Sequence, residues 1–284
     1  MNDAPTPPGT ECLLRFDKVN LRFEEIVALD SVSFELHAGD TRVVLGAAGS
    51  GKTTLLKAAI GLIRPDAGKI YLFNKEITGL KEAQLFDLRS GVGVLFQEGG
   101  LFDSVTVEEN VAYPLLNRTE HPESLAEAEP KVKEALRFVE LEQTLEQYPS
   151  ELSGGMRRRV GIARAVVSEP PLVLYDSPTA GLDPITANTI MALIVKERDS
   201  KNTANLIVTQ RYQDGQLMAN FRYNRNSGHL EPVSSNGAGG GNGSNPTRTI
   251  FMVMKDGRVV FEGTQHELEA SQDDYVRKFV PKHT

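Results

Sequence analysis

The chain has 284 residues, 40% of them hydrophobic, and a formal net charge of −7. This length can bury a large core in one domain or two small ones, while the acidic balance and the lack of a basic stripe argue against nucleic-acid binding. The single cysteine, Cys12, excludes an intramolecular disulfide and the usual thiolate metal-site spacings, which fits a reducing compartment. We expect neither a signal peptide nor a spanning helix, because the first residues are polar and proline-rich and no run of about eighteen apolar residues follows. Any link to a membrane should therefore run through a partner.

The first part of the chain reads as strands joined by tight turns. Over residues 13–45, apolar runs such as 13–16 (LLRF) and 32–36 (VSFEL) alternate with Asp and Gly. Residues 41–45 form the strand that leads into a glycine-rich loop, and residues 53–61 carry helix formers with an apolar face. The order of strand, loop and helix is the one that a phosphate-binding loop needs.

Residues 46–53 read GAAGSGKT, which fits the pattern G-x-x-x-x-G-K-T. The glycines let backbone N–H groups converge on phosphates, and the following helix presents its positive end. Lys52 would reach the outer phosphates of ATP, Thr53 would place its hydroxyl on Mg²⁺, and Asp176, at the end of an apolar strand, would hold the ion through water. A chance glycine-rich turn is the alternative, and the flanking strand, helix and aspartate argue against it. The predicted phosphate-binding set is Gly46, Ala47, Ala48, Gly49, Ser50, Gly51, Lys52, Thr53 and Thr54.

Two helical segments and a closing section are expected next. Residues 120–145 are rich in Glu, Ala, Lys and Leu, and residues 153–168 begin at a serine cap, so both predict helices. We assign them to a helical subdomain over about residues 98–165. Residues 208–223 and 250–262 read as the closing strands and connections of the main sheet. Between them, residues 234–245 are almost wholly Gly, Ser and Asn and predict a flexible loop or linker.

Residues 152–156 (LSGGM), taken with the phosphate loop, resemble the signature of the ATP-binding-cassette ATPases. The resemblance covers about residues 13–265 and leaves residues 266–284 as a C-terminal tail. It implies an α/β fold: a P-loop NTPase core of ABC type with an antiparallel β subdomain and a small helical signature subdomain. Its implied cofactors are ATP and Mg²⁺.

The same resemblance implies that the signature completes the nucleotide site of a second subunit, so that ATP joins a homodimer, or a heterodimer with a second cassette. A serine that merely caps its own helix is the plainer reading of Ser153. The family's remaining landmarks fall on Gln97, as a catalytic and metal-binding glutamine, on Asp183 at the nucleotide, and on Phe23 stacked on adenine. The signature residues themselves are Ser153, Gly154 and Gly155.

A narrower resemblance, to the cassette ATPases of Mla and Mce-type lipid transporters, lies in residues 96–102 (FQEGGLF) and 110–115 (NVAYPL). It implies hydrophobic cargo such as phospholipid, an ABC permease, an Mce-like or MlaD-like substrate-binding protein, and a place at the cytoplasmic face of the inner membrane. Phe102, Val105 and Tyr113 are then candidates for a socket around the permease, with core packing as the alternative. Residues 273–280 resemble a tail that can touch a neighbouring subunit, or else a terminal helix packed on its own domain.

Two residues depart from the family pattern at the γ-phosphate. Ser177 stands where a glutamate activates water, and Gln210 stands where a histidine is usual. A serine hydroxyl can orient water but is no general base near neutral pH, and losing a positioned base costs about 10²–10⁴ in rate. Slow hydrolysis is therefore expected, since the positioning and charge stabilisation by Lys52 and Mg²⁺ are retained.

Glu98 directly follows Gln97 and is a candidate replacement for the missing base, although a solvated surface glutamate is the simpler reading. Two alternatives to a transport ATPase stay open. One is an ATP-gated clamp that does not hydrolyse, and the other is a soluble cassette protein outside transport.

Overall fold

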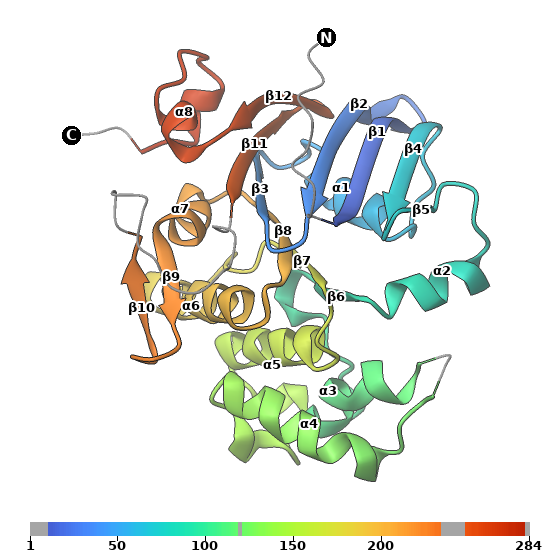
Figure 1. The fold of residues 1–284 in the computed structure, drawn as a ribbon, viewed down its shortest axis with the longest axis vertical. Coiled ribbons are helices and arrows are strands. Elements are labelled where there is room, and N and C mark those ends of the chain that lie inside the picture. The colour runs from blue at the N-terminus through green and yellow to red at the C-terminus, as the bar shows by residue number, and fades with distance from the viewer. Residues whose placement is uncertain (1–10, 119–120, 234–247, 282–284) are drawn as a thin grey trace.

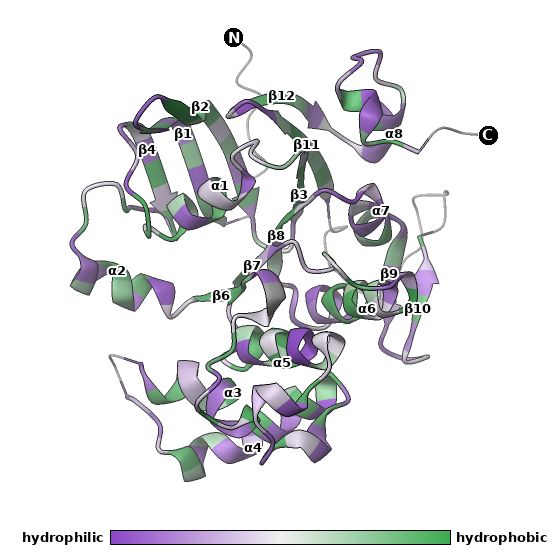
Figure 2. Ribbon diagram, turned by 180° about the vertical axis from the view of Figure 1, so that it is seen from behind, coloured by the Kyte–Doolittle hydropathy of each residue, from purple (hydrophilic) through white to green (hydrophobic). Residues whose placement is uncertain are grey.

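The computed structural model describes residues 11–118, 121–233 and 248–281. Its centre is a six-stranded sheet with the strand order β12-β11-β3-β8-β7-β6, parallel except for β12 at one edge. Every residue of β3, β7 and β8 is buried, because helices or a second sheet cover both faces, and this explains their continuous apolar runs. Figure 2 shows the hydrophobic colouring along β3 and β11. The strands are β3 (Thr41–Gly46), β6 (Val92–Leu95), β7 (Leu172–Asp176), β8 (Ala204–Thr209), β11 (Thr249–Lys255) and β12 (Arg258–Gly263).

A second, antiparallel sheet of four strands lies beside the first, in the order β2-β1-β4-β5 (Figure 1). Its side chains alternate along β2: Val32, Phe34 and Leu36 are buried, and the residues between them face outward. Helix α1 (Lys52–Ala59) packs against strands of both sheets and joins their cores. The strands are β1 (Cys12–Phe23), β2 (Ile26–His37), β4 (Ala67–Leu72) and β5 (Lys75–Glu76).

The helical region has its own apolar cluster, centred on Val111, Leu136 and Val160. Capping boxes begin two of its helices, at Thr106 and at Ser124, and the helices expected over residues 120–145 and 153–168 are confirmed as α4 and α5. Between these two lie only short 3₁₀ turns. Helix α2 (Glu82–Arg89) precedes this region and buries Leu85 in the core around α1. The elements of the region are η1 (Gln97–Gly99), α3 (Val107–Leu116), α4 (Leu125–Phe138), η2 (Glu142–Thr144), η3 (Pro149–Glu151) and α5 (Gly154–Val166).

The last part of the chain agrees only partly with the expected closing strands of the main sheet. Strands β11 and β12 confirm the closing role of residues 250–262. Residues 212–220, however, form helix α7, and the segment after it folds into a hairpin whose two strands pair only with each other, with β9 packed on α6. The expectation of main-sheet strands across residues 208–223 is therefore wrong beyond β8, and residues 234–245 lie outside the described residues. The elements are α6 (Pro184–Lys201), α7 (Tyr212–Asn220), β9 (Phe221–Asn224), β10 (His229–Pro232), α8 (Gln265–Glu269) and η4 (Val276–Lys278).

The C-terminal tail packs on its own domain. Val276 is fully buried against an apolar cluster that includes Val43 and Phe251. Across the described segments, no helix has both the length and the apolar content to span a bilayer.

Candidate nucleotide site

Four neighbouring parallel strands end at one edge of the central sheet, and the predicted site residues follow them. The register pairs Leu45 of β3 with Thr209 of β8, and Asp176 of β7 with Val208. Parallel strands place their carboxyl ends together, and open α/β sheets bind ligands outside those ends. The fold therefore gathers the phosphate loop, Asp176, Gln210 and Gln97 along one edge.

The phosphate loop is shaped by glycine backbone. Gly49 and Gly51 have φ values of 78° and 100°. Residues with a Cβ rarely adopt such positive φ values. A Cβ on Gly51 would come within 2.3 Å of the Ala28 carbonyl oxygen, so the close approach to β2 also requires glycine. Helix α1 begins here without a side-chain cap, which leaves the N–H groups of its first turn to bind an anion.

Lys52 is buried and spans the loop. Its Nζ donates to the carbonyl oxygens of Gly46 and Ala47, both at 2.7 Å, and to Ser50 Oγ at 3.2 Å. Burial lowers the pKa of the Lys52 ammonium, against an opposing effect of the Asp176 charge. The ammonium is thus held by neutral oxygens at the place where phosphate oxygens would be stronger acceptors.

Thr53 and Asp176 meet across the site. Thr53 Oγ1 donates to Asp176 Oδ2 at 3.0 Å, and Asp176 Oδ1 accepts from Ser177 Oγ at 3.1 Å. A hydroxyl and a carboxylate at this distance are oxygen donors of the kind that Mg²⁺ binds together with phosphates and water. The residues present therefore fit a magnesium ion.

Ser177 is held in a left-handed conformation with φ of 51°. Its N–H donates to the Val208 carbonyl at 2.8 Å. Arg158 of α5, almost fully buried, donates from Nη1 to the carbonyl oxygens of Ser177, Pro178 and Ala180, at 3.1, 2.8 and 3.2 Å. The signature helix thereby fixes the loop that carries Ser177. Arg158 lies in no motif of the sequence, and its only signal is a charged residue on a helix face that is otherwise buried.

A second polar network secures the same loop from the other side. Thr179 Oγ1 donates to both oxygens of buried Asp214, at 2.9 and 2.7 Å, and Thr209 Oγ1 donates to one of them at 2.6 Å. Burial raises the pKa of Asp214, against these hydrogen bonds. The network joins the ends of β7 and β8, where Gln210 follows with its side chain exposed. Asp214 was also missed by sequence reasoning.

The remaining predicted residues lie on other elements. Phe23 is exposed at the end of β1 beside Ile26. Ser153 Oγ accepts from the Met156 N–H at 3.2 Å, and Asp183 Oδ1 accepts from two N–H groups of α6, so both cap helices. Both ribbon views separate α5 from α1, so one chain does not bring its signature to its own phosphate loop (Figures 1 and 2). The side chain of Glu98 lies outside the described residues.

An apolar groove of about 480 Å³ lies between α2, α3 and α5. The rings of Phe102 and Tyr113, 43% and 47% exposed, pack at 4.8 Å between centroids on its wall. Arg164 lies 5.6 Å from the Phe102 ring and donates to the Gly99 carbonyl at 3.0 Å, so the groove is connected to the segment after Gln97. Val105 is not among its lining residues.

The tail reaches the phosphate loop directly. The Tyr275 hydroxyl accepts from the Ala47 N–H at 3.4 Å and donates to the Met254 carbonyl at 3.2 Å. Tyr275 belongs to residues 273–280, and both of these contacts lie within its own chain.

Comparisons with known proteins agree with this geometry. A family model described as ABC transporter matches residues 29–180. The chain is 31% identical over 263 residues to MlaF of Haemophilus influenzae, an ATP-binding protein of an intermembrane phospholipid transport system, covering 92% of this chain and 88% of that protein. It is 40% identical over 188 residues to the methionine import protein MetN of Rhizobium johnstonii and 39% over 180 residues to the probable ribonucleotide transport protein mkl of Mycobacterium leprae, spanning about half (51%) of each.

Among solved structures, the ATP-binding cassette MJ0796, a dimer in a post-hydrolysis state with ADP and Pi, superposes with a TM-score of 0.73 at 27% identity. The match covers 89% of this chain and 98% of that one. The predicted fold class, a P-loop core with an antiparallel subdomain and a helical subdomain, is confirmed.

Proposed function

The chain belongs to the ABC transporter family of ATP-binding proteins, and from that premise we propose that it binds and slowly hydrolyses MgATP to drive the movement of phospholipid. The observation that carries the nucleotide part is the Thr53–Asp176 pair, 3.0 Å apart, beside the uncapped start of α1. The loop N–H groups would bind the phosphates, and Lys52 would exchange its carbonyl partners for phosphate oxygens. Exposed Phe23 offers a ring for the adenine.

In hydrolysis, a water oxygen attacks the γ-phosphorus, the bond to the bridging oxygen of ADP breaks, and the proton of the water passes to a phosphate oxygen. Thr53 and Asp176, with Gln97 as the third predicted ligand, would hold Mg²⁺, which would supply neutralising charge. Ser177 Oγ orients the water by hydrogen bonding, and the Gln210 amide donates to a γ-phosphate oxygen. Neither accepts a proton readily at neutral pH, so the step is slow.

The signature would act across a dimer. Because α5 lies apart from α1 in one chain (Figure 1), Ser153, Gly154 and Gly155 are free to meet the γ-phosphate of a second copy. Asp183, the N-cap of α6, would contact the same nucleotide. The dimeric state of MJ0796 supports this arrangement. A homodimer uses both complete sites, and a heterodimer with another cassette is the second possibility.

Phospholipid cargo is favoured by coverage: the match to MlaF extends over 88% of that protein, whereas the matches to MetN and mkl stop near half. The groove at Phe102 and Tyr113 offers an apolar seat for a permease segment, which would place the chain at the cytoplasmic face of the inner membrane. An Mce-like protein would complete the complex. The higher identity to MetN over the shorter stretch keeps import of a small polar solute as the second candidate.

The test is transfer of a fluorescent phospholipid between two vesicle populations, with the chain bound to its permease in one of them. We expect transfer and phosphate release that both require MgATP and are lost in Lys52→Ala. Hydrolysis without lipid transfer would remove the phospholipid proposal and leave the ATPase. Phe102→Ala with Tyr113→Ala should reduce assembly with the permease while the isolated chain keeps its phosphate release.

The clamp alternative makes a different prediction in the same assay. If Ser177 and Gln210 abolish hydrolysis, phosphate release from the parent will equal that of Lys52→Ala while ATP still binds to the parent alone. Recovery of a second, non-identical cassette with the native complex would then identify the subunit that hydrolyses ATP.

A further inference from the structure

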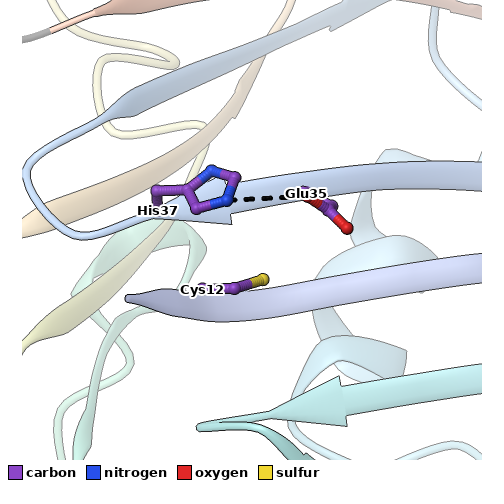
Figure 3. Close-up of side chains that lie close together, drawn as sticks. All are labelled: Cys12, Glu35 and His37. Atoms are coloured by element: carbon purple, nitrogen blue, oxygen red, sulfur yellow. Dashed lines mark ion pairs between the residues drawn. The ribbon is translucent and has the colours of Figure 1, made fainter. Parts of the chain in front are cut away.

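Cys12, Glu35 and His37 lie together at the open end of the β1–β2 hairpin (Figure 3). Glu35 and His37 are two residues apart on β2 and therefore point to the same face of the sheet. Cys12 is the cross-strand partner of His37. The buried neighbours Phe34 and Leu36 point the other way, so the three side chains gather on the outer face of the four-stranded sheet.

We propose that this cluster is a zinc site, formed by one thiolate, one imidazole and one carboxylate. The ligand atoms of the three residues lie within 4.8 Å of one another. His37 Nε2 and Glu35 Oε2 are 3.5 Å apart, close to the separation of about 3.4 Å that two ligands at about 2.0–2.1 Å impose around a tetrahedral Zn²⁺. Cys12 Sγ lies within the same 4.8 Å and 3.7 Å from the Leu14 carbonyl oxygen.

The chemistry of the donors selects the metal. A thiolate disfavours Mg²⁺ and Ca²⁺, which take oxygen ligands, and its combination with imidazole and carboxylate is typical of Zn²⁺. Three protein ligands leave one tetrahedral position for water, which is the arrangement of an open site. A short sequence motif cannot reveal such a site, because Cys12 and His37 are far apart in the sequence. The pairing of β1 with β2 brings them together.

The nearby cations do not pair with the Glu35 carboxylate. Arg15, its cross-strand neighbour, lies over the Tyr71 ring at 4.0 Å. Arg42 pairs with Glu262 and donates to the Glu35 backbone carbonyl at 2.6 Å, not to its carboxylate. Within the described residues, His37 is the one ion-pair partner that the Glu35 carboxylate has. The imidazole is largely shielded, with 17% of its side chain exposed, so a bound ion would be partly withdrawn from solvent.

The test uses the full chain without a polyhistidine tag, freed of metal by chelation and titrated with Co²⁺ in the absence of nucleotide. We expect one equivalent to bind with a thiolate-to-cobalt charge-transfer absorption, and Zn²⁺ to displace it. Since Cys12 is the chain's single cysteine, that absorption reports this site alone. A metal bound at Thr53 and Asp176 has no thiolate and gives no such band.

Cys12→Ser should abolish the band, and Glu35→Gln and His37→Asn should each weaken Zn²⁺ binding at least about tenfold. His229→Asn, which changes an exposed histidine on β10, is the matched control and should bind like the parent. Absence of the thiolate band in the parent, or equal Zn²⁺ affinity in parent and Cys12→Ser, would overturn the proposal. Cys12→Ser is nearly isosteric, so it decides the question even if another variant folds poorly.

Discussion

Ser177 limits the chemistry at the scale of a single residue. Its hydroxyl already donates to Asp176 at 3.1 Å, so it points toward the predicted metal rather than serving as a base. Replacing it with glutamate adds a carboxylate at the position where the attacking water would be activated. We expect Ser177→Glu to raise phosphate release by about 10²-fold, within the range for a positioned general base.

The matched variant is Ser177→Gln, which has the same size without the basicity and should stay as slow as the parent. If both variants behave alike, the missing base is not what limits the rate. Glu98→Gln in the parent background tests the other candidate: unchanged release would remove Glu98 from the mechanism.

Glu197 gives the chain a pH-dependent stability. It is 2% exposed, its Oε1 accepts from Thr203 Oγ1 at 2.7 Å, and its Oε2 has no partner among the described residues. Burial raises its pKa from 4.5 to about 7. Between these values the unfolded chain releases a proton that the folded protein keeps, so the free energy of unfolding falls as pH rises, by at most about 3 kcal/mol.

Glu197→Gln removes that penalty. Urea unfolding at pH 5 and pH 8 should show the variant gaining stability over the parent mainly at pH 8. Glu134→Gln, at the exposed mouth of the adjoining cavity, is the control and should follow the parent at both pH values. A parallel pH dependence of Glu197→Gln and the parent would contradict the prediction.

At the scale of elements, α5 contacts several parts of the site. It begins with the signature and holds the Ser177 loop through Arg158. It also packs against the segment after Gln97 at Gly161, where a Cβ would come within 3.0 Å of the Gly99 carbonyl oxygen. We expect Arg158→Ala to lower the free energy of unfolding by about 3 kcal/mol, because several buried carbonyls lose a charged donor.

Arg159→Ala is the internal comparison, since Arg159 donates to the single Val139 carbonyl at 3.1 Å and should cost about 1 kcal/mol. Urea unfolding of the two variants, at neighbouring positions of one helix, measures both losses in the free energy of unfolding. Equal losses would mean that the three-carbonyl contact contributes nothing beyond an ordinary hydrogen bond.

Local patterns in the sequence predict α1, α4, α5 and the phosphate loop well, because caps, glycines and apolar spacing act over a few residues. Arg158 and Asp214 escape such reasoning, since their partners lie up to 35 residues away and only the packed fold selects them. The hairpin β9–β10 was missed for another reason. Apolar and polar residues alternate only weakly over residues 212–223, and this stretch forms both α7 and the start of β9. The assignment of nucleotide-binding and catalytic roles remains a prediction that the measurements above address.

At the scale of the whole molecule, the signature is predicted to act on a second copy. Slow hydrolysis should let MgATP-bound dimers accumulate, visible as a doubled mass in light scattering, and Lys52→Ala should remain monomeric. Ser153→Asp separates the two readings of Ser153: aspartate still caps α5, so stability is kept, while its charge repels the γ-phosphate and the dimer is lost.

Ser104→Asp, an exposed serine outside the predicted contact, controls for added charge and should dimerise as the parent does. A Ser153→Asp chain that dimerises normally would reduce Ser153 to a helix cap.

The hydrogen bonds from Arg158 to the Ser177 loop have a kinetic consequence for such a dimer. The start of α5 would sense the nucleotide of one site, while its second turn holds the water-orienting loop of the other. Binding at either site then alters the geometry of both, so the two sites could not turn over independently. The rate of phosphate release should rise sigmoidally with ATP concentration in the parent. Arg158→Lys, whose shorter side chain withdraws the donor from the three carbonyls that Arg158 Nη1 contacts, should flatten the curve toward a hyperbola.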